Sequence, residues 1–110
     1  MSTIKSTREI DAVFRAAKRV AHPTLIALVA RTPEGRGRAG RVAFVAGKKL
    51  GGAVQRNRCK RVMREAARRA GAPWSDFDVV LMARPNTGTA TPLELDSALG
   101  GIVIRAGLRR

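Results

Sequence analysis

The segment RVAFVAGKKLGGAVQRNRCKRVMREAARR, residues 41–69, decides the fold because it combines a strand, a turn and a helix in one run. Its apolar start predicts a strand over 41–46. The glycine-flanked lysines of 47–52 predict a turn. The apolar spacing then becomes helical and predicts a helix over 54–70, which ends where Gly71 follows.

The two sides of this predicted helix differ in chemistry. Small and apolar side chains share one side at helical spacing, namely Cys59, Val62, Met63, Ala66 and Ala70. Cations occupy the opposite side and its margins, and four of them form an i, i+4 ladder of Arg56, Lys60, Arg64 and Arg68. Like charges at this spacing repel by about 0.2–0.5 kcal/mol per pair, and only Glu65 supplies a counter-charge within the helix. The pattern therefore favours a polyanionic partner over a merely solvated face.

The chain before this segment predicts a helix and a strand. Ser6 and Glu9 have the spacing of a capping box, and the apolar residues after them predict a helix over 7–19, broken at His22-Pro23. An apolar run predicts a strand over 24–30. Because only a short loop separates it from the strand at 41–46, we expect these two strands to pair as an antiparallel hairpin.

The chain after this segment predicts a strand and a last helix. The nearly continuous apolar run over 77–84 predicts a central strand. Thr91 and Glu94 form a second capping box with Pro92 between them, which predicts a helix whose end Gly100-Gly101 leaves open. The predicted order is helix, strand, strand, helix, strand, helix, an α+β class of fold in the form of an α/β sandwich.

Length and composition fit one nucleic-acid-binding domain over residues 1–110. The formal net charge is +14, from 22 Lys and Arg against 8 Asp and Glu, which implies a polyanion as partner. A lipid surface would favour large apolar residues beside the cations, whereas small ones stand there, so nucleic acid is favoured over a membrane. No apolar run has the length of a membrane span, the first residues lack a secretory pattern, and one cysteine allows no internal disulfide. We therefore expect a cytoplasmic protein.

Other candidate sites are weaker. The GKKLGG turn lacks the spacing of a phosphate-binding P-loop. Cys59 falls in the apolar stripe and is expected to be packed, and His22 before Pro23 is expected to be a turn residue. Asp76 and Asp78 offer paired carboxylates that a metal-dependent nuclease would need, although acids at a strand entry are more often turn residues. The sequence thus predicts no catalytic set and no metal site.

The ordered combination RVAFVAGKKLGGAVQRNRCKRVMREAARR resembles the bacterial ribonuclease P protein family, with its strand, Lys-Lys turn and A-V-x-R-N-R-x-K-R core. DVVLMARP (78–85) is similar to the family's later strand. The resemblance implies a protein subunit that binds a catalytic RNA and the 5′ leader of precursor tRNA and assists endonucleolytic removal of the leader. It places the hydrolysis in the RNA, with Mg²⁺ used by the holoenzyme, and it implies a left-handed βαβ crossover.

The resemblance also implies two RNA-binding surfaces. The first, with the end of the cation ladder included, comprises Lys48, Lys49, Arg56, Asn57, Arg58, Lys60, Arg61, Arg64 and Arg68. The second is a cleft between the first helix and the sheet, where Phe14 is a candidate for stacking on a leader base and core packing is the alternative. Ile10 and Leu28 stand where family members often have aromatic residues.

Two other functions remain open from the residues alone. One is a non-catalytic structural RNA-binding protein of the ribosomal-protein type. The other is an autonomous nuclease that uses Asp76 and Asp78.

Overall fold

The structure is a computed structural model that describes residue 10 and residues 13–15, 17–32 and 39–108. The strands are β1 (Lys18–Ala21), β2 (Leu25–Arg31), β3 (Arg41–Val45) and β4 (Phe77–Ala83). The helices are α2 (Ala53–Arg69) and α3 (Pro92–Ala106), and the 3₁₀ turns are η1 (Lys48–Leu50) and η2 (Thr87–Thr89). Ile10 and residues 13–15 are also helical, as predicted for the first helix, whereas the Ser6–Glu9 capping box lies outside the described residues.

The four-stranded sheet has the order β1-β2-β4-β3. β4 pairs antiparallel with β2 and parallel with β3, so the predicted hairpin between the strands at 24–30 and 41–46 is wrong. The most apolar strand takes the centre instead, because Val79, Val80 and Leu81 are all 0% exposed there. The prediction that this last strand is central is confirmed.

The first strand, β1, has no sequence pattern that predicts it. β1 begins at Lys18, where the helix was expected to continue to Arg19, and it pairs antiparallel with β2. His22-Pro23 is therefore the turn of a hairpin, in which the His22 amide donates to the Leu25 carbonyl and the Thr24 amide donates to His22 Nδ1. A short edge strand with one buried residue, Val20, has too little alternation to be recognised locally.

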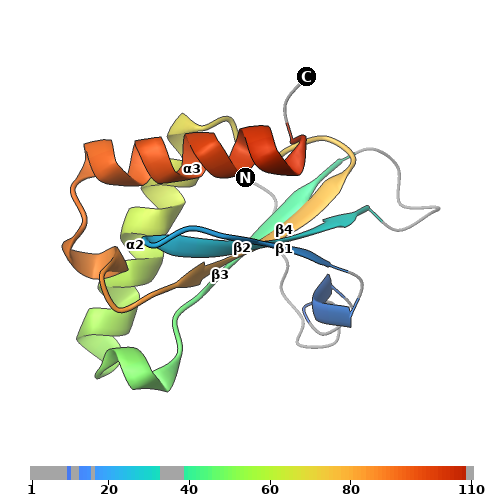
Figure 1. Cartoon of the computed structure of the whole chain (residues 1–110). Coiled ribbons are helices and arrows are strands. Elements are labelled where there is room, and N and C mark those ends of the chain that lie inside the picture. Colours follow the sequence, from blue (N-terminus) through green and yellow to red (C-terminus); the bar gives the residue numbers. More distant parts are fainter. Residues whose placement is uncertain (1–9, 11–12, 16, 33–38, 109–110) are drawn as a thin grey trace.

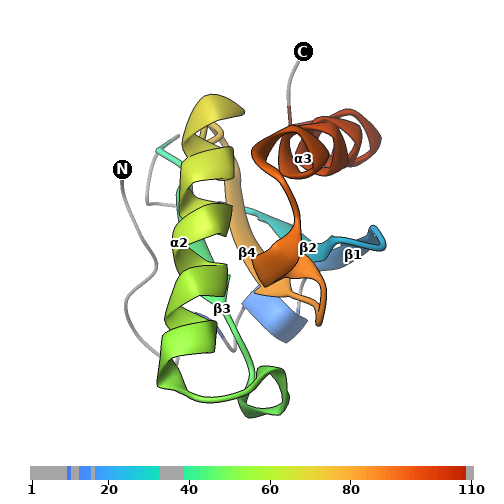
Figure 2. The same ribbon diagram turned by 90° about the vertical axis from the view of Figure 1, so that its left-hand side faces the viewer.

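The sheet separates two apolar layers. α2 and α3 cover one face, and the helical residues before β1 lie at the other (Figures 1 and 2). The larger cluster joins the two helices to the sheet and includes Met63, Leu81, Leu95, Leu99 and Ile102. The smaller cluster comprises Val13, Leu28, Ala30, Ala43 and Val80, with Ile10, Ala17, Val45 and Met82 packed against it. The fold is thus the predicted α/β sandwich, with one strand more than expected.

The β3–α2–β4 unit is a crossover between parallel neighbours. Gly40, directly before β3, lies very close to the turn that precedes β4. A Cβ atom added at Gly40 would clash with the Trp74 carbonyl oxygen. Only glycine allows this approach. The parallel pairing confirms a βαβ crossover, and its left-handedness stays an implication of the family resemblance.

α3 begins at the predicted capping box. The Glu94 amide donates to Thr91 Oγ1 at 3.1 Å, and the Thr91 amide donates to Glu94 Oε1 at 2.9 Å. The helix continues through Gly100 and Gly101 to Ala106, and it stops at Gly107, whose φ of 69° is left-handed. Burial of one side of the helix against the sheet outweighs the roughly 1 kcal/mol that each internal glycine costs.

We predict that Thr91→Ala lowers the free energy of unfolding by about 1 kcal/mol, because the helix loses its N-terminal side-chain cap. For a domain of this size, that corresponds to a melting temperature lower by about 4 °C in thermal unfolding.

The matched control is Ser97→Ala on the exposed side of the same helix, which should leave the melting temperature nearly unchanged.

The hydrogen bond from the Thr91 backbone lowers the pKa of the Glu94 carboxyl below its ordinary value of 4.5. The stabilisation by ionised Glu94 is therefore present above pH 4.5 and is lost as the pH falls through the lower folded pKa. Equal melting temperatures for Thr91→Ala and Ser97→Ala at neutral pH would contradict this assignment of the cap.

Candidate nucleic-acid interface

α2 is fixed to the sheet by the apolar side chains of its inner side, which are small except for Met63. Cys59, Met63, Ala66 and Ala67 are buried, at 0–5% exposure. Cys59 is therefore a packed residue, as predicted. Val62 and Ala70 lie half-buried at the edges of this stripe, whereas Ala67 completes it beyond the predicted set. Small inner residues bring the helix backbone close to the sheet, which leaves the long cationic side chains pointing outward.

The basic face is defined here by the predicted residues of α2. Its exposed members are Asn57, Arg58, Arg61, Arg64 and Arg68, and its half-buried members are Arg56 and Lys60. Lys48 and Lys49 are exposed in η1, directly before the helix. The structure thus brings the predicted residues together along one helix and the turn that leads into it.

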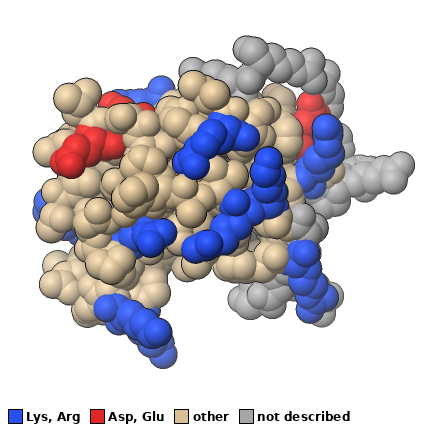
Figure 3. Space-filling view, viewed as in Figure 1, with Lys and Arg blue, Asp and Glu red and all other residues tan. Residues whose placement is uncertain are grey.

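Basic residues outnumber acidic ones in the chain, with 22 Lys and Arg against 8 Asp and Glu. On the molecular face drawn in Figure 3, basic side chains are spread across the surface, whereas acidic ones occupy only small areas. The first turn of α2 carries no acidic residue, so its positive helix dipole adds to the charge of the side chains. The surface therefore has the electrostatic character of a phosphate-binding region.

Arg58 is held in place by a connection far along the chain. Its Nε donates to the Gly88 carbonyl at 2.8 Å. Gly88 belongs to η2, where buried Thr87 donates to the Thr24 carbonyl and accepts from the Arg84 amide. Arg58 is therefore oriented by the protein, with its terminal nitrogens left for a partner.

Arg64 and Arg69 also have partners within the protein. The Arg64 guanidinium carbon lies 5.3 Å from the centroid of the Phe44 ring. Arg69 turns to the other side of the helix, where its Nε donates to Asp96 at 2.8 Å and links α2 to α3. These contacts separate Arg69 from the basic face.

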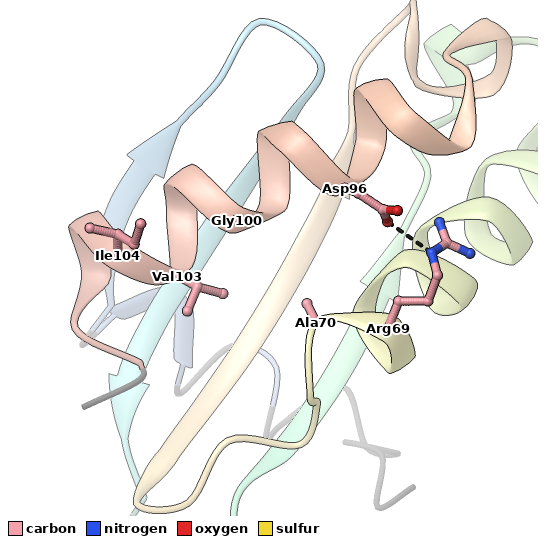
Figure 4. A pocket seen from close by; sticks show the side chains of 6 residues that line it. All are labelled: Arg69, Ala70, Asp96, Gly100, Val103 and Ile104. Atoms are coloured by element: carbon pink, nitrogen blue, oxygen red, sulfur yellow. Dashed lines mark hydrogen bonds and ion pairs between the residues drawn. The ribbon is translucent and has the colours of Figure 1, made fainter.

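Two hollows lie beside α2. One, of about 360 Å³, is lined by Val54, Asn57, Arg58 and Arg61 and opens on the basic face itself. The other, of about 370 Å³, lies between α2 and α3 and ends at the Arg69–Asp96 ion pair, with Gly100, Val103 and Ile104 on its helix α3 side (Figure 4). Only the first hollow belongs to the cationic surface.

A larger groove lies where β3 and β4 end. It measures about 550 Å³ and is lined by Val45, Gly47, Lys48, Lys49, Leu50, Met82, Ala83 and Pro85. Val45 and Met82 pack against the smaller apolar cluster, so the groove opens on the sheet face opposite to α2 and α3. The two lysines thus connect this mainly apolar groove to the start of the basic face.

Phe14 belongs to the helical residues 13–15, which lie at the sheet face opposite to α2 and α3. Its neighbour Val13 is 5% exposed and packs on the sheet, whereas Phe14 is 43% exposed. The core packing predicted as the alternative for Phe14 is therefore not observed, and its stacking on a base stays a prediction. Leu28 is buried and Ile10 half-buried, so these two side chains serve the core.

The predicted alternative of an acidic metal site has little support in the geometry. Asp78 is 2% exposed, and its carboxylate lies 3.7 Å from the Arg41 guanidinium. Asp76 sits in a turn at φ 72°, ahead of the strand. Within the described residues, no three His, Cys, Asp or Glu side chains form a group that could hold a metal ion. No helix in the described part of the chain is long and apolar enough to cross a membrane.

Comparisons with known proteins agree with this arrangement. The family model "Ribonuclease P" matches residues 1–107. The chain belongs to the ribonuclease P protein family. It is 32% identical to the ribonuclease P protein component of Exiguobacterium over 103 residues, which cover 94% of this chain and 88% of that protein. It is 38% identical to the one from Dehalococcoides mccartyi over 66 residues, 60% of this chain and 54% of the relative's length.

A solved structure supports the fold independently. The ribonuclease P protein of Staphylococcus aureus superposes with a TM-score of 0.83, at 22% sequence identity, over 100% of this chain and 99% of that one. The family therefore keeps this sandwich although most residues differ. The family predicted from the sequence is confirmed by the family model and by the relatives of similar sequence, and the solved structure confirms the fold.

We predict that Arg61→Ala weakens binding to a structured RNA and lowers the slope of log affinity against log salt by about 0.7–0.9, because one phosphate contact is lost. The melting temperature should stay nearly unchanged, since Arg61 is exposed. Affinity is measured by filter binding over a salt series.

The matched control is Arg69→Ala, which removes the same charge from the same helix at a position bound to Asp96. It should change RNA affinity less than Arg61→Ala. Equal losses for the two variants would show that total charge, and not the basic face, governs binding.

Proposed function

We propose that this chain is the protein subunit of ribonuclease P, acting in the cytoplasm in tRNA processing. It binds the catalytic RNA and the 5′ leader of precursor tRNA and assists endonucleolytic removal of the leader. The observation that carries the proposal is the one-sided basic face of α2, and membership of the ribonuclease P protein family supports it.

The basic face is proposed to bind the catalytic RNA. Guanidinium groups form paired hydrogen bonds to phosphate oxygens, and Asn57 offers a neutral donor and acceptor beside them. Neutralising phosphates releases counterions, so the affinity arises mainly from charge and falls steeply with salt. A net charge of +14 makes such a complex favourable and the free protein self-repelling.

The chemistry is proposed to reside in the RNA. The one buried acid of the described residues, Asp78, faces Arg41 instead of an open site. Mg²⁺ is proposed to act in the holoenzyme, where RNA phosphates supply its preferred oxygen ligands. The protein contributes cations, which screen the repulsion between two RNA strands and allow them to approach.

The leader is proposed to run along the sheet face opposite to α2. Exposed Phe14 offers one ring for stacking on a base, and the groove beside Met82 and Pro85 offers apolar contact. Lys48 and Lys49 stand at the end of this path and attract its phosphates. Charge and apolar contact replace the additional aromatic residues that the family often has at Ile10 and Leu28.

We predict that the purified protein does not cleave precursor tRNA alone. With the cognate catalytic RNA at low magnesium concentration, it should increase the rate of leader removal above that of the RNA by itself. The measurement is a single-turnover cleavage assay with end-labelled precursor tRNA.

Two results would contradict the proposal in different ways. Binding of RNA without any change of the cleavage rate would favour a structural RNA-binding protein of the ribosomal type. Cleavage by the protein alone, abolished by Asp78→Asn, would favour an autonomous nuclease.

We predict that Phe14→Ala weakens binding of precursor tRNA to the holoenzyme by about fivefold or more, because base stacking contributes at least about 1 kcal/mol. Affinity for mature tRNA, which lacks the leader, should not change. Val13→Ala is the matched control, since it removes buried apolar surface and should lower the melting temperature without selectivity for the leader. Equal weakening for both tRNA forms would exclude a leader contact by Phe14.

A further inference from the structure

The contact between Arg64 and Phe44 joins the basic face to the edge of the sheet. Phe44 lies on β3, the edge strand beside α2, and is half-buried against the larger apolar cluster. The Arg64 guanidinium carbon lies 5.3 Å from the ring centroid, within the range of a cation–π interaction. Arg64 itself is exposed. An anchored ring therefore holds a solvent-facing cation.

An unrestrained arginine loses conformational entropy whenever it binds a phosphate, because its long side chain has many rotamers. A ring that already restricts the guanidinium reduces this loss at the moment of binding. Phe44 keeps its own position through packing, so it can restrict Arg64 without contacting the RNA.

We propose that Phe44 is a positioning residue for RNA binding, which presets the Arg64 guanidinium for a phosphate of the RNA partner. This inference rests on the proposed function of the basic face.

Arg58 supports this interpretation from the other side of the helix. Its Nε is fixed by the Gly88 carbonyl, so Arg58 and Arg64 are both oriented by contacts outside α2. They are six positions apart along the helix, which corresponds to about 9 Å of helix rise. At helical spacing they flank Arg61 on its two sides, so the protein orients one cation on each side of Arg61.

The chain contains a matched control for this arrangement. Arg31 lies over the Phe77 ring at 5.7 Å, on the paired strands β2 and β4, and it does not belong to the basic face. Phe77 is half-buried, like Phe44. Replacing either ring by leucine removes the same kind of contact and a similar amount of apolar surface, but only Phe44→Leu affects a cation of the basic face.

The test measures the affinity of the full chain for the cognate catalytic RNA over a salt series, with melting temperatures for every variant. Phe44→Leu should weaken binding about two- to fivefold. Its salt slope should stay that of the parent, because no charge is removed, whereas Arg64→Ala should lower the slope. Phe77→Leu should leave affinity unchanged, and Phe44→Tyr, which keeps an aromatic ring, should bind as the parent does.

A double-mutant cycle decides how Phe44 acts. In the Arg64→Ala background, Phe44→Leu should have no further effect on affinity. A persisting effect there would show that the ring contacts RNA itself, and unchanged affinity of Phe44→Leu in the parent would show no role; either result overturns the proposal. Equal weakening by Phe44→Leu and Phe77→Leu, in proportion to lowered melting temperatures, would assign both rings a purely structural part. Failure of the parent to bind the RNA would instead reject the proposed function.

Discussion

The packing of α2 on the sheet through apolar, mainly small side chains is the constraint on which the rest of the structure depends. Cys59, Met63, Ala66 and Ala67 are almost fully buried, so one side of the helix is committed to the core. This burial offsets the mutual repulsion of the cations on the opposite side, which cost about 0.2–0.5 kcal/mol per adjacent pair. A helix with this charge and no such anchor would gain little from folding before an anion arrives. The basic face therefore exists as a surface only because the inner side is apolar and compact.

The local parts of this fold could be predicted from the sequence. The bounds predicted for α2 differ by one residue from those of the structure, and the Thr91–Glu94 box begins α3 as expected. Both depend on spacing and capping within a few residues of the chain. The family and the residues of the basic face also followed from one continuous segment, residues 41–69.

The pairing of strands could not be predicted in the same way. The strands at 24–30 and 41–46 are close in sequence, yet β4 lies between them because its three consecutive buried apolar residues, Val79, Val80 and Leu81, require cover on both faces. The first two residues of β1 fall within the helix predicted over 7–19, because Lys18 and Arg19 give no strand pattern and only pairing with β2 defines them. Tertiary contact overrides local preference in both cases. For the same reason, the contacts that orient the basic face could not be predicted, since no sequence pattern links Arg58 to Gly88 or Arg64 to Phe44.

The arginines of α2 are consequently not equivalent, although a helical projection treats them alike. Arg69 is bound to Asp96 and stabilises the contact between two helices. Arg58 and Arg64 are oriented by neutral neighbours, a backbone carbonyl and an aromatic ring, which do not compensate the positive charge of the guanidinium group. A fixed cation loses less entropy on binding than a free one, whereas a cation paired with an acid must first give up its partner. In the proposed complex, the contribution of each arginine to the free energy of phosphate binding thus depends on its partner within the protein more than on its exposed fraction.

The position of η1 explains how one small domain can serve two RNA segments in the proposed complex. The basic face and the apolar groove lie on opposite sides of the sheet. Apolar side chains pack on both faces of the sheet centre, so an RNA segment cannot pass through it from one surface to the other. The chain leaves β3 at Val45 on the groove side and enters α2 at Ala53, with η1 between them. Lys48 and Lys49 therefore stand where the two surfaces meet, and their charge makes the junction favourable for phosphates from either side. The crossover from β3 to α2 is thus both the element that completes the parallel pair and the connection between the two proposed binding surfaces.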